Sequence, residues 1–424
     1  MKKNISILFA ILFFCHEGCS QQSIYEQLKN INGISITKKD NLHFKEYYEI
    51  FIDQPIDHFN PQSKLFKQRI CVGITNLNAP TVLETEGYAI GNALTPFTLK
   101  GCNLILVEHR YFGKSIPDSL DWNFLTVKQA AYDYHEIKEL FVKILKGKWL
   151  TTGISKGGQA ALAYKMYFPD EVNATLAYVT PIKKSVNDPR IGKFFNTVSK
   201  TENGKKVFAF QQFAFRNKKL LLKEFDKYVA DKGFTFGAMQ NETVFEYLLL
   251  EYPFAFFQNA FNTKLIPDTA TSSPDKIIEE IAEVVPVRFY TEAFRQKLEP
   301  SFYMFYHELG YYEYDLTSVK QWLSKENYPN NIFAPKNSSN DFDPAYLTSL
   351  NKFISNHTTK GIIFIYGEND PYTSTKAVFE KNDSLQMYIA KGGSHKSRIK
   401  DLSPAQQQKV YKQLSAWLKW KITG

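Results

Sequence analysis

The sequence predicts an α/β fold in which a mostly parallel β-sheet is split by one long helical insertion. Short apolar runs typical of strands alternate with helical patterns over residues 47–180. Over residues 184–359 the strand patterns cease, and the sequence is helical, aromatic and charged. Strand patterns resume at residue 362, and the chain closes with a helical pattern. Because alternating strands and helices build parallel sheets with helices on both faces, these observations favour a doubly wound sheet.

The segment before the insertion supplies most of the predicted elements. The predicted strands are 47–52, 69–75, 81–87, 103–108, 149–153 and 174–180. The predicted helices are 24–31, 126–146 and 158–167. The run at 103–108 is apolar in the manner of a strand that is buried on both faces of a parallel sheet.

The insertion is predicted to form a helical cap. It begins after the strand that ends at residue 180, and open α/β sheets hold their sites at the carboxyl ends of their strands. We therefore expect a cap domain at 184–359 over that edge, and a core domain made of 21–183 and 360–424. The last predicted elements are strands at 362–366 and 385–389 and a helix at 404–420.

The N-terminus has the pattern of an export signal. Two lysines precede an apolar run, 5–14, that is too short for a comfortable membrane span. Small residues then suit cleavage, which predicts a signal peptide over residues 1–20 and an exported chain, either periplasmic or secreted. A lipid anchor on Cys19 is the alternative, although the preceding histidine and glutamate fit a lipoprotein signal poorly. No later segment has the length and apolar character of a membrane span.

The charge and the cysteines argue against several kinds of site. A net charge of +9 is spread along the chain, with lysines mixed among acids, which indicates a solvated basic surface rather than a nucleic-acid site. Cys71 and Cys102 remain after removal of the leader, and they form either one disulfide or two buried thiols. Because they lack the histidine and cysteine neighbours of a zinc site, no metal and no cofactor are expected.

One run has the pattern of a nucleophile elbow. Residues 153–157, Gly-Ile-Ser-Lys-Gly, fit G-x-S-x-G between a predicted strand and a predicted helix. A nucleophilic serine on such a turn needs glycines two positions away, because neighbouring backbone passes close to them. The helix that follows points backbone N–H groups at a developing oxyanion. The run therefore predicts Ser155 as a nucleophile.

Two later loops supply the partners that a serine nucleophile needs. Asp370 follows the strand predicted at 362–366, with Glu368 as a neighbouring alternative, and His395 follows the last predicted strand in a glycine-rich loop. The histidines that do not follow the final strand are His43, His58, His109, His135, His307 and His357. The order serine, aspartate, histidine is that of the α/β-hydrolases, so we expect this fold with a triad of Ser155, Asp370 and His395.

Each member of this triad has an expected role. His395 takes the proton from the Ser155 hydroxyl and later gives it to the leaving group, while Asp370 holds the tautomer of the imidazole. The backbone N–H of Lys156 is expected to be one oxyanion donor. The second is expected in the loop after Glu86, at the backbone N–H of Tyr88.

Two stretches carry a resemblance to a known family. Residues 108–115, EHRYFGKS, and 153–158, GISKGG, look like those of the bacterial secreted tripeptidyl aminopeptidases. The resemblance also covers the leading strands, the cap segment at 308–312 and the loops of Asp370 and His395. It implies an α/β-hydrolase serine peptidase, distantly similar to lysosomal prolyl carboxypeptidase and dipeptidyl peptidase, with the same triad. The implied reaction releases short peptides, expected to be tripeptides, from free N-termini.

An aminopeptidase must also recognise the free α-amine of its peptide substrate. A carboxylate in a partly dry pocket does this well. Glu86 lies beside the expected oxyanion loop, and Glu308 and Glu313 lie in an aromatic segment of the cap, so these three are the candidates. Arg110 is expected to be a structural ion-pair partner, and the aromatic runs of the cap are expected to serve packing.

Two other functions remain open at this level. The same triad serves carboxylic-ester hydrolases, and an aromatic cap would suit an acyl chain. A catalytically silent binding protein on a hydrolase scaffold is the third interpretation, although such proteins usually lose a triad member and none is lost here.

Overall fold

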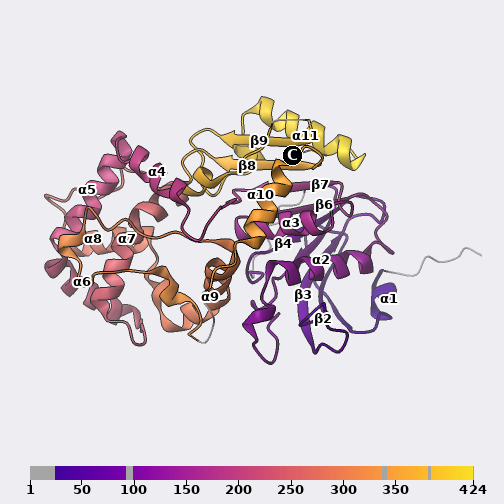
Figure 1. Ribbon diagram of the computed structural model, residues 1–424, viewed down its shortest axis with the longest axis horizontal. Coiled ribbons are helices and arrows are strands. Elements are labelled where there is room, and N and C mark those ends of the chain that lie inside the picture. Colours follow the sequence, from indigo (N-terminus) through magenta and orange to yellow (C-terminus); the bar gives the residue numbers. More distant parts are fainter. Residues whose placement is uncertain (1–23, 92–98, 337–340, 381–382, 424) are drawn as a thin grey trace, which may run out of the picture.

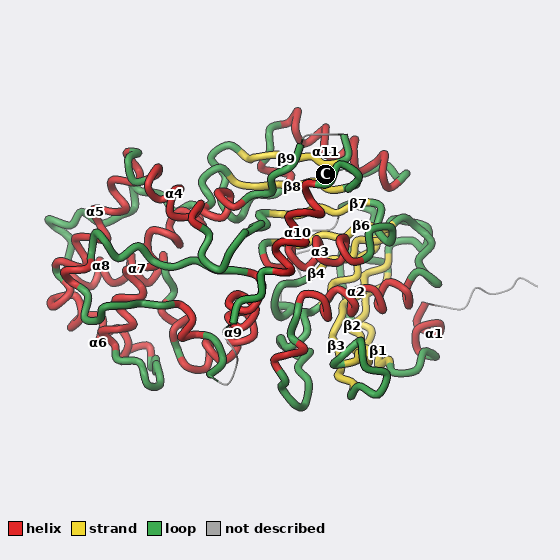
Figure 2. The backbone as a smooth tube through the Cα atoms, viewed as in Figure 1, coloured by secondary structure: helices red, strands yellow, loops and turns green. Residues whose placement is uncertain are grey.

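The computed structural model describes residues 24–91, 99–336, 341–380 and 383–423. The predicted signal segment and Cys19 lie outside these described residues. The described chain forms two lobes, one that holds the sheet and one that is helical (Figures 1 and 2). None of its helices is long and apolar enough to cross a membrane.

The described residues form one sheet of nine strands in the order β1-β2-β3-β5-β4-β6-β7-β8-β9. The strands are β1 (Ile34–Lys38), β2 (Glu46–Pro55), β3 (Leu65–Ile74), β4 (Thr81–Thr85), β5 (Asn103–Val107), β6 (Trp149–Ile154), β7 (Ala174–Tyr178), β8 (Ile362–Gly367) and β9 (Leu385–Ala390). Strand β1 pairs with β2, β2 with β3 and β3 with β5, all three antiparallel. The remaining neighbours, β5 with β4, β4 with β6, β6 with β7, β7 with β8 and β8 with β9, are all parallel. The parallel part confirms the prediction, whereas β1, a short edge strand, was not predicted.

Helices cover both faces of this sheet. They are α1 (Ile24–Lys29), α2 (Val127–Phe141), α3 (Lys156–Tyr167), α10 (Ala345–Ser355) and α11 (Pro404–Leu418). Tyr134 on α2 and Tyr164 on α3 pack with Ile105 of the sheet, whereas Leu414 on α11 packs with Ile363 in a separate apolar cluster. Burial of these clusters is the main driving force that holds the layers together.

The second lobe is built from the helical segment between β7 and β8. Its helices are α4 (Pro189–Val198), α5 (Glu202–Arg216), α6 (Lys218–Lys232), α7 (Asn241–Asn259), α8 (Pro274–Val284) and α9 (Glu292–Met304), followed by a π-helical turn, Phe305–Leu309. This lobe has an apolar core of its own, with α7 at its centre (Figure 1). Across both lobes, the described chain also has 3₁₀ helices at Trp122–Phe124, Val287–Tyr290, Lys320–Trp322, Asn330–Phe333, Pro371–Thr375 and Ile399–Asp401.

The segment that was expected to be one cap packs in two parts. Helices α4 to α8 belong to the helical lobe, but α10 returns to the sheet, where Leu350 and Ile354 pack against Phe364 of β8. The cap limits at 184 and 359 stay a prediction, and the contacts group α10 with the sheet.

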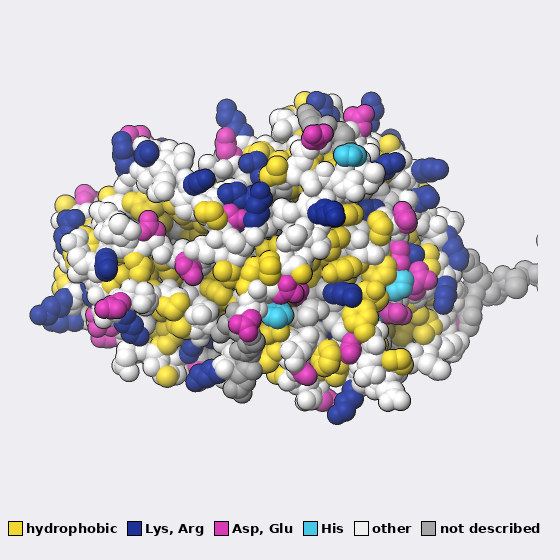
Figure 3. Space-filling view, viewed as in Figure 1, with side chains coloured by type: hydrophobic (Ala, Val, Ile, Leu, Met, Phe, Trp, Pro, Cys, Tyr) yellow, Lys and Arg dark blue, Asp and Glu magenta, His cyan; other side chains and the backbone are white. Residues whose placement is uncertain are grey.

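The structure also shows the state of the two cysteines and the distribution of charged side chains on the surface. Cys71 and Cys102 are both buried and both free, which is the second of the two arrangements that the sequence left open. On the face drawn in Figure 3, basic and acidic side chains are interspersed rather than gathered into one patch. Such mixing is the ordinary arrangement of a solvated surface.

Candidate active site

Ser155 lies on a sharp turn between β6 and α3. Its backbone has φ 54° and ψ −118°, a conformation that L-residues rarely adopt. The flanking glycines are needed because backbone passes close to them. A Cβ at Gly157 would lie 2.4 Å from the carbonyl oxygen of Thr85, and one at Gly153 would lie 2.3 Å from the backbone of Gly157. The turn therefore has the strained, close-packed backbone that the sequence pattern predicts.

Asp370 and His395 meet at the carboxyl ends of β8 and β9. The Nδ1 of His395 is 2.7 Å from the Oδ2 of Asp370. The Asp370 side chain is fully buried, and its Oδ1 accepts the N–H of Tyr372 at 3.1 Å. The His395 side chain is 16% exposed, so the ring is reachable on one side. This is the geometry in which a carboxylate fixes the tautomer of an imidazole.

Backbone hydrogen bonds join the loops of Asp370 and His395. The N–H of Asn369 donates to the carbonyl oxygen of Gly393 at 2.8 Å. Glu368, the alternative acid, is exposed, and its carboxylate accepts the N–H of Gly392 at 2.8 Å. Glu368 thus braces the histidine loop, whereas Asp370 contacts the histidine ring.

The elbow lies at the same edge of the sheet. The strands β6, β7, β8 and β9 are parallel neighbours, and the N–H of Ser155 donates to the carbonyl oxygen of Tyr178 at the end of β7. Within the described part of the chain, neither the Ser155 hydroxyl nor the His395 Nε2 forms a hydrogen bond. Serine–histidine hydrogen bonds are often long without substrate and shorten in the complex.

The Lys156 side chain turns back beneath the elbow. Its Nζ donates to the carbonyl oxygen of Gly87 at 2.6 Å and lies 5.4 Å and 4.8 Å from the ring centres of Tyr88 and Phe112. Burial lowers the pKa of Lys156 to about 7, although the nearby Glu308 opposes the shift. Among the described residues, the backbone N–H groups of Lys156 and Tyr88 have no hydrogen-bond partner, so both are free to donate.

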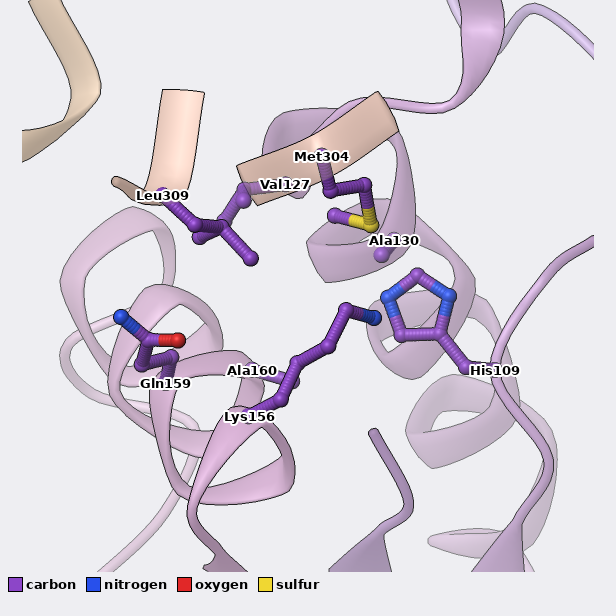
Figure 4. A pocket seen from close by; sticks show the side chains of 8 residues that line it. All are labelled: His109, Val127, Ala130, Lys156, Gln159, Ala160, Met304 and Leu309. Atoms are coloured by element: carbon purple, nitrogen blue, oxygen red, sulfur yellow. The ribbon is translucent and has the colours of Figure 1, made fainter. Parts of the chain in front are cut away.

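A small enclosed cavity lies beside this lysine. Figure 4 shows the Lys156 ammonium pointing toward the His109 ring, with Met304 and Leu309 of the helical lobe closing the space. The cavity holds about 10 Å³, which is room for one water and not for a substrate. Burial and the neighbouring Lys156 hold the pKa of His109 well below its usual range, so this histidine is neutral.

The three carboxylates predicted to bind an amine lie in different surroundings. Glu308 is buried, and its carboxylate accepts the N–H of Val127 at the start of α2; burial raises its pKa to about 8. Glu313 is exposed and accepts the side-chain N–H of Asn187 at 3.1 Å. Glu86 is half-buried, and burial together with Glu108 raises its pKa to about 7.

Sequence reasoning missed a fourth carboxylate, that of Glu251 on α7. The hydroxyl of Tyr312 lies 2.8 Å and 2.9 Å from its two oxygens, and the hydroxyl of Tyr314 lies 2.8 Å from one of them. Burial raises the pKa of Glu251 to about 7. The only signal in the sequence is a single acid within the otherwise apolar run at 248–257.

Two contacts tie the helical lobe to the site. The N–H of His395 donates to the carbonyl oxygen of Gln258 near the end of α7 at 2.9 Å. The buried Nζ of Lys183 donates to the carbonyl oxygen of Gly310 at 2.7 Å. A cavity of about 200 Å³ lies between the end of α7 and the loops that carry Asn369 and Gly392.

Other charged groups near the fold have structural roles. Arg110 donates to both oxygens of Asp133 at 2.8 Å, and both side chains are fully buried, which confirms the predicted structural ion pair. His135, Glu139 and Glu171 are close enough together to hold a metal ion. Because Glu139 is exposed and paired with Lys138, we assign no metal to this cluster.

The topology and the elbow define an α/β-hydrolase with a serine at the end of its central parallel strands. The chain belongs to the PS-10 peptidase S37 family, whose model matches residues 19–421, and it is a serine peptidase. It is 25% identical over 410 residues to the prolyl tri/tetrapeptidyl aminopeptidase of Streptomyces mobaraensis. This alignment covers 94% of this chain and 85% of that protein.

More distant similarities are partial. The lysosomal Pro-X carboxypeptidase of Mus musculus is 29% identical over 180 residues, which cover 37% of this chain and 36% of that protein. Among solved structures, the proline iminopeptidase of Mycobacterium smegmatis superposes with a TM-score of 0.39 and 12% identity over 86% of this chain and 99% of that one.

Proposed function

We propose that this protein is an exported serine aminopeptidase that releases short peptides, chiefly tripeptides, from free N-termini. Ser155 attacks the scissile carbonyl and forms an acyl-enzyme, and water then releases the peptide. His395 acts as base and then as acid, and Asp370 orients it. The observation that carries the proposal is the 2.7 Å contact between His395 and Asp370 at the sheet edge that also presents the strained Ser155.

The oxyanion donors in this proposal are the backbone N–H groups of Lys156 and Tyr88. In a trans peptide the C=O and N–H groups point in opposite directions. The Lys156 ammonium holds the Gly87 carbonyl at 2.6 Å, so the N–H of Tyr88 in the same peptide unit is directed away from that ammonium. Lys156 thereby acts as a positioning residue for the second donor, and its own backbone N–H supplies the first.

The choice of substrate rests on the comparisons. The Streptomyces relative is named for prolyl tripeptides and tetrapeptides, and it aligns with nearly the whole of this chain. We propose the same class of substrate here, with proline among the residues accepted before the cut. Export through the segment at 1–20 is part of the proposal, since the apolar run and its small flanking residues have the pattern of a signal peptide.

Two measurements test the proposal. A fluorophosphonate should label the protein, and mass spectrometry should locate the label on Ser155. The protein is then given peptides with proline at the second, third or fourth position, each with a free and an acetylated N-terminus. We expect tripeptide products from the free forms and little cleavage of the acetylated forms. Equal cleavage of both forms, or turnover of long-chain esters without peptide cleavage, contradicts it.

A further inference from the structure

The Glu251 carboxylate lies on the helix that ends beside the histidine loop, and it has no positively charged partner among the described residues. Among the ion pairs of the described residues none includes Glu251, although its side chain lies on a helix at the centre of the helical lobe. The contrast with Glu246, an earlier acid on the same helix, is clear. Glu246 is fully buried, forms an ion pair with Lys218 and accepts hydrogen bonds from Ser324. Buried carboxylates are ordinarily paired in this way.

Within the described part of the chain, the Glu251 carboxylate is instead held by hydroxyl groups alone. Tyr312 and Tyr314 donate to its two oxygens at 2.8–2.9 Å and so fix the direction of the carboxylate. A carboxylate offers about four acceptor positions, and these contacts leave room for a further donor. The residue is half-buried, in contrast to the fully buried side chain of Glu246.

A continuous set of aromatic rings joins this carboxylate to the catalytic histidine. The ring centre of Tyr372 lies 5.4 Å from that of His395, and the ring centre of Tyr312 lies 6.3 Å from that of Tyr372. Phe254, three residues after Glu251 on the same helix, stacks on Tyr312 at 4.1 Å. Burial chiefly raises the pKa of Tyr372, and the negative charges of Glu251 and Asp370 add to this shift.

The length of this path fits a short peptide. Three extended residues span at most about 10–11 Å. The steps of 5.4 Å from His395 to Tyr372 and 6.3 Å from Tyr372 to Tyr312 keep the His395 and Tyr312 ring centres within about 12 Å of each other, and Glu251 lies one hydrogen bond from Tyr312. A short peptide of about three residues is therefore long enough to reach from a positive group at Glu251 to a carbonyl that is attacked beside His395.

We propose that the Glu251 carboxylate, oriented by Tyr312 and Tyr314, binds the α-ammonium group of the peptide substrate and thereby sets the length of the released product. This inference rests on the proposed aminopeptidase function. It assigns the role to a different carboxylate from those that the sequence offered. Glu308 already accepts a helix N–H. Among the described residues, Glu86 has no side-chain hydrogen bond that would orient its carboxylate, whereas two hydroxyls orient that of Glu251.

The test compares a Glu251→Gln variant with the unaltered protein on two chromogenic substrates, one tripeptide anilide with a free N-terminus and its acetylated twin. Loss of a charge-assisted hydrogen bond to the ammonium should raise KM for the free substrate and lower its kcat/KM on the order of 100-fold. The acetylated substrate has no ammonium, so its kcat/KM should stay unchanged. The rate of fluorophosphonate labelling should also stay unchanged.

The chain offers a matched control and a milder variant. Glu280 on α8 accepts the hydroxyl of Tyr252 at 2.7 Å and is also half-buried, so Glu280→Gln changes the same chemistry elsewhere in the lobe and should keep the selectivity. Tyr314→Phe removes one donor while leaving the Glu251 charge in place. It should raise KM for the free substrate by less than Glu251→Gln does. If Glu251→Gln does not fold, Tyr314→Phe takes its place in the comparison of the two substrates.

The outcomes separate the inference from the function on which it rests. If the unaltered protein prefers the free N-terminus and Glu251→Gln keeps that preference, the inference is wrong and the aminopeptidase function stands. A loss of preference in Glu86→Gln but not in Glu251→Gln also overturns it. If the unaltered protein cleaves both substrates equally or is not labelled at Ser155, the proposed function fails and the inference fails with it.

Discussion

The two halves of the candidate site are built in different ways. On the sheet side, Ser155, Asp370 and His395 each lie in the turn or loop that follows a parallel strand, and backbone hydrogen bonds between neighbouring loops set their positions. On the side of the helical lobe, Glu251 and its two tyrosines are about 60 residues apart in sequence and meet through aromatic packing. The sheet side is thus fixed by the regular backbone, and the lobe side by side-chain packing. We expect changes on the sheet side to act on kcat and changes on the lobe side to act on KM.

The largest expected effect is that of Ser155→Ala on the sheet side. Loss of the nucleophile should lower kcat on the order of 10⁶-fold. The hydroxyl has no partner among the described residues, so the free energy of unfolding should change by less than about 0.5 kcal/mol. Single-turnover kinetics and thermal unfolding measure the two quantities. Activity close to that of the unaltered protein would assign the nucleophile elsewhere.

The next effect distinguishes the two acids of one loop. Asp370→Asn should lower kcat on the order of 10⁴-fold, because an amide cannot hold the imidazole in the required tautomer. Glu368→Gln is the matched control, since Glu368 contacts only the backbone of Gly392 in this loop pair, and it should leave kcat nearly unchanged. If Glu368→Gln lowered kcat strongly and Asp370→Asn did not, Glu368 would be the acid that orients His395.

A smaller effect compares two buried lysines, one on each side of the site. Lys156→Met should lower kcat about 10- to 100-fold, less than deletion of an oxyanion donor, because the Gly87 carbonyl loses its partner and the Tyr88 peptide unit loosens. Lys183 donates to Gly310 in the same manner but ties the helical lobe to the core, so Lys183→Met should change mainly KM. Steady-state kinetics on one peptide substrate separate the two results. Equal effects on kcat would remove the distinction between the two sides.

The last effect is on stability rather than on rate, and it is a pH dependence at the junction of the lobes. Burial raises the pKa of Glu308 from 4.5 to about 8, so between these values the folded state binds more protons than the unfolded state. The contribution of this group to stability is therefore fully present below pH 4.5 and is lost as the pH rises toward 8, with a slope of at most about 1.4 kcal/mol per pH unit. Glu308→Gln should remove this dependence. Urea unfolding of both proteins at several pH values between these limits measures the free energy of unfolding. If this free energy changed with pH in the same way in both proteins, the prediction would be wrong.

The placement of the loops on the sheet side could be predicted from sequence because its signals are local, while the catalytic roles of Ser155, Asp370 and His395 stay a prediction. A strand pattern, a glycine and a polar residue lie next to one another along the chain, and parallel strands bring their carboxyl ends to one edge. The two elbow glycines could be recognised in the sequence for the same reason, because close approach of the backbone leaves no room for a Cβ at Gly153 or Gly157. The bond between Asp370 and His395 follows from two such loops on neighbouring strands.

The sequence predicted a helical segment at 184–359, but it could not predict how the helices of that segment pack, because their arrangement depends on long-range contacts. The sequence pattern at 184–359 does not predict that α10 packs against the sheet, because the apolar face of α10 would suit either lobe. It also gave no reason to prefer Glu251 over Glu86, Glu308 or Glu313, because only the folded chain shows which carboxylate has a helix N–H or an amide as its partner.

The amino-acid sequence by itself determined the α/β class, the order of the catalytic loops and the family resemblance, because strand periodicity and turn glycines are properties of short segments. The tertiary structure alone decided that Lys156 reaches the Gly87 carbonyl and that Tyr312 and Tyr314 converge on Glu251. These contacts join residues about 60 to 70 positions apart, and the packing of whole helices places them. The reaction can therefore be inferred from local pattern, whereas recognition of the substrate depends on how the two lobes meet.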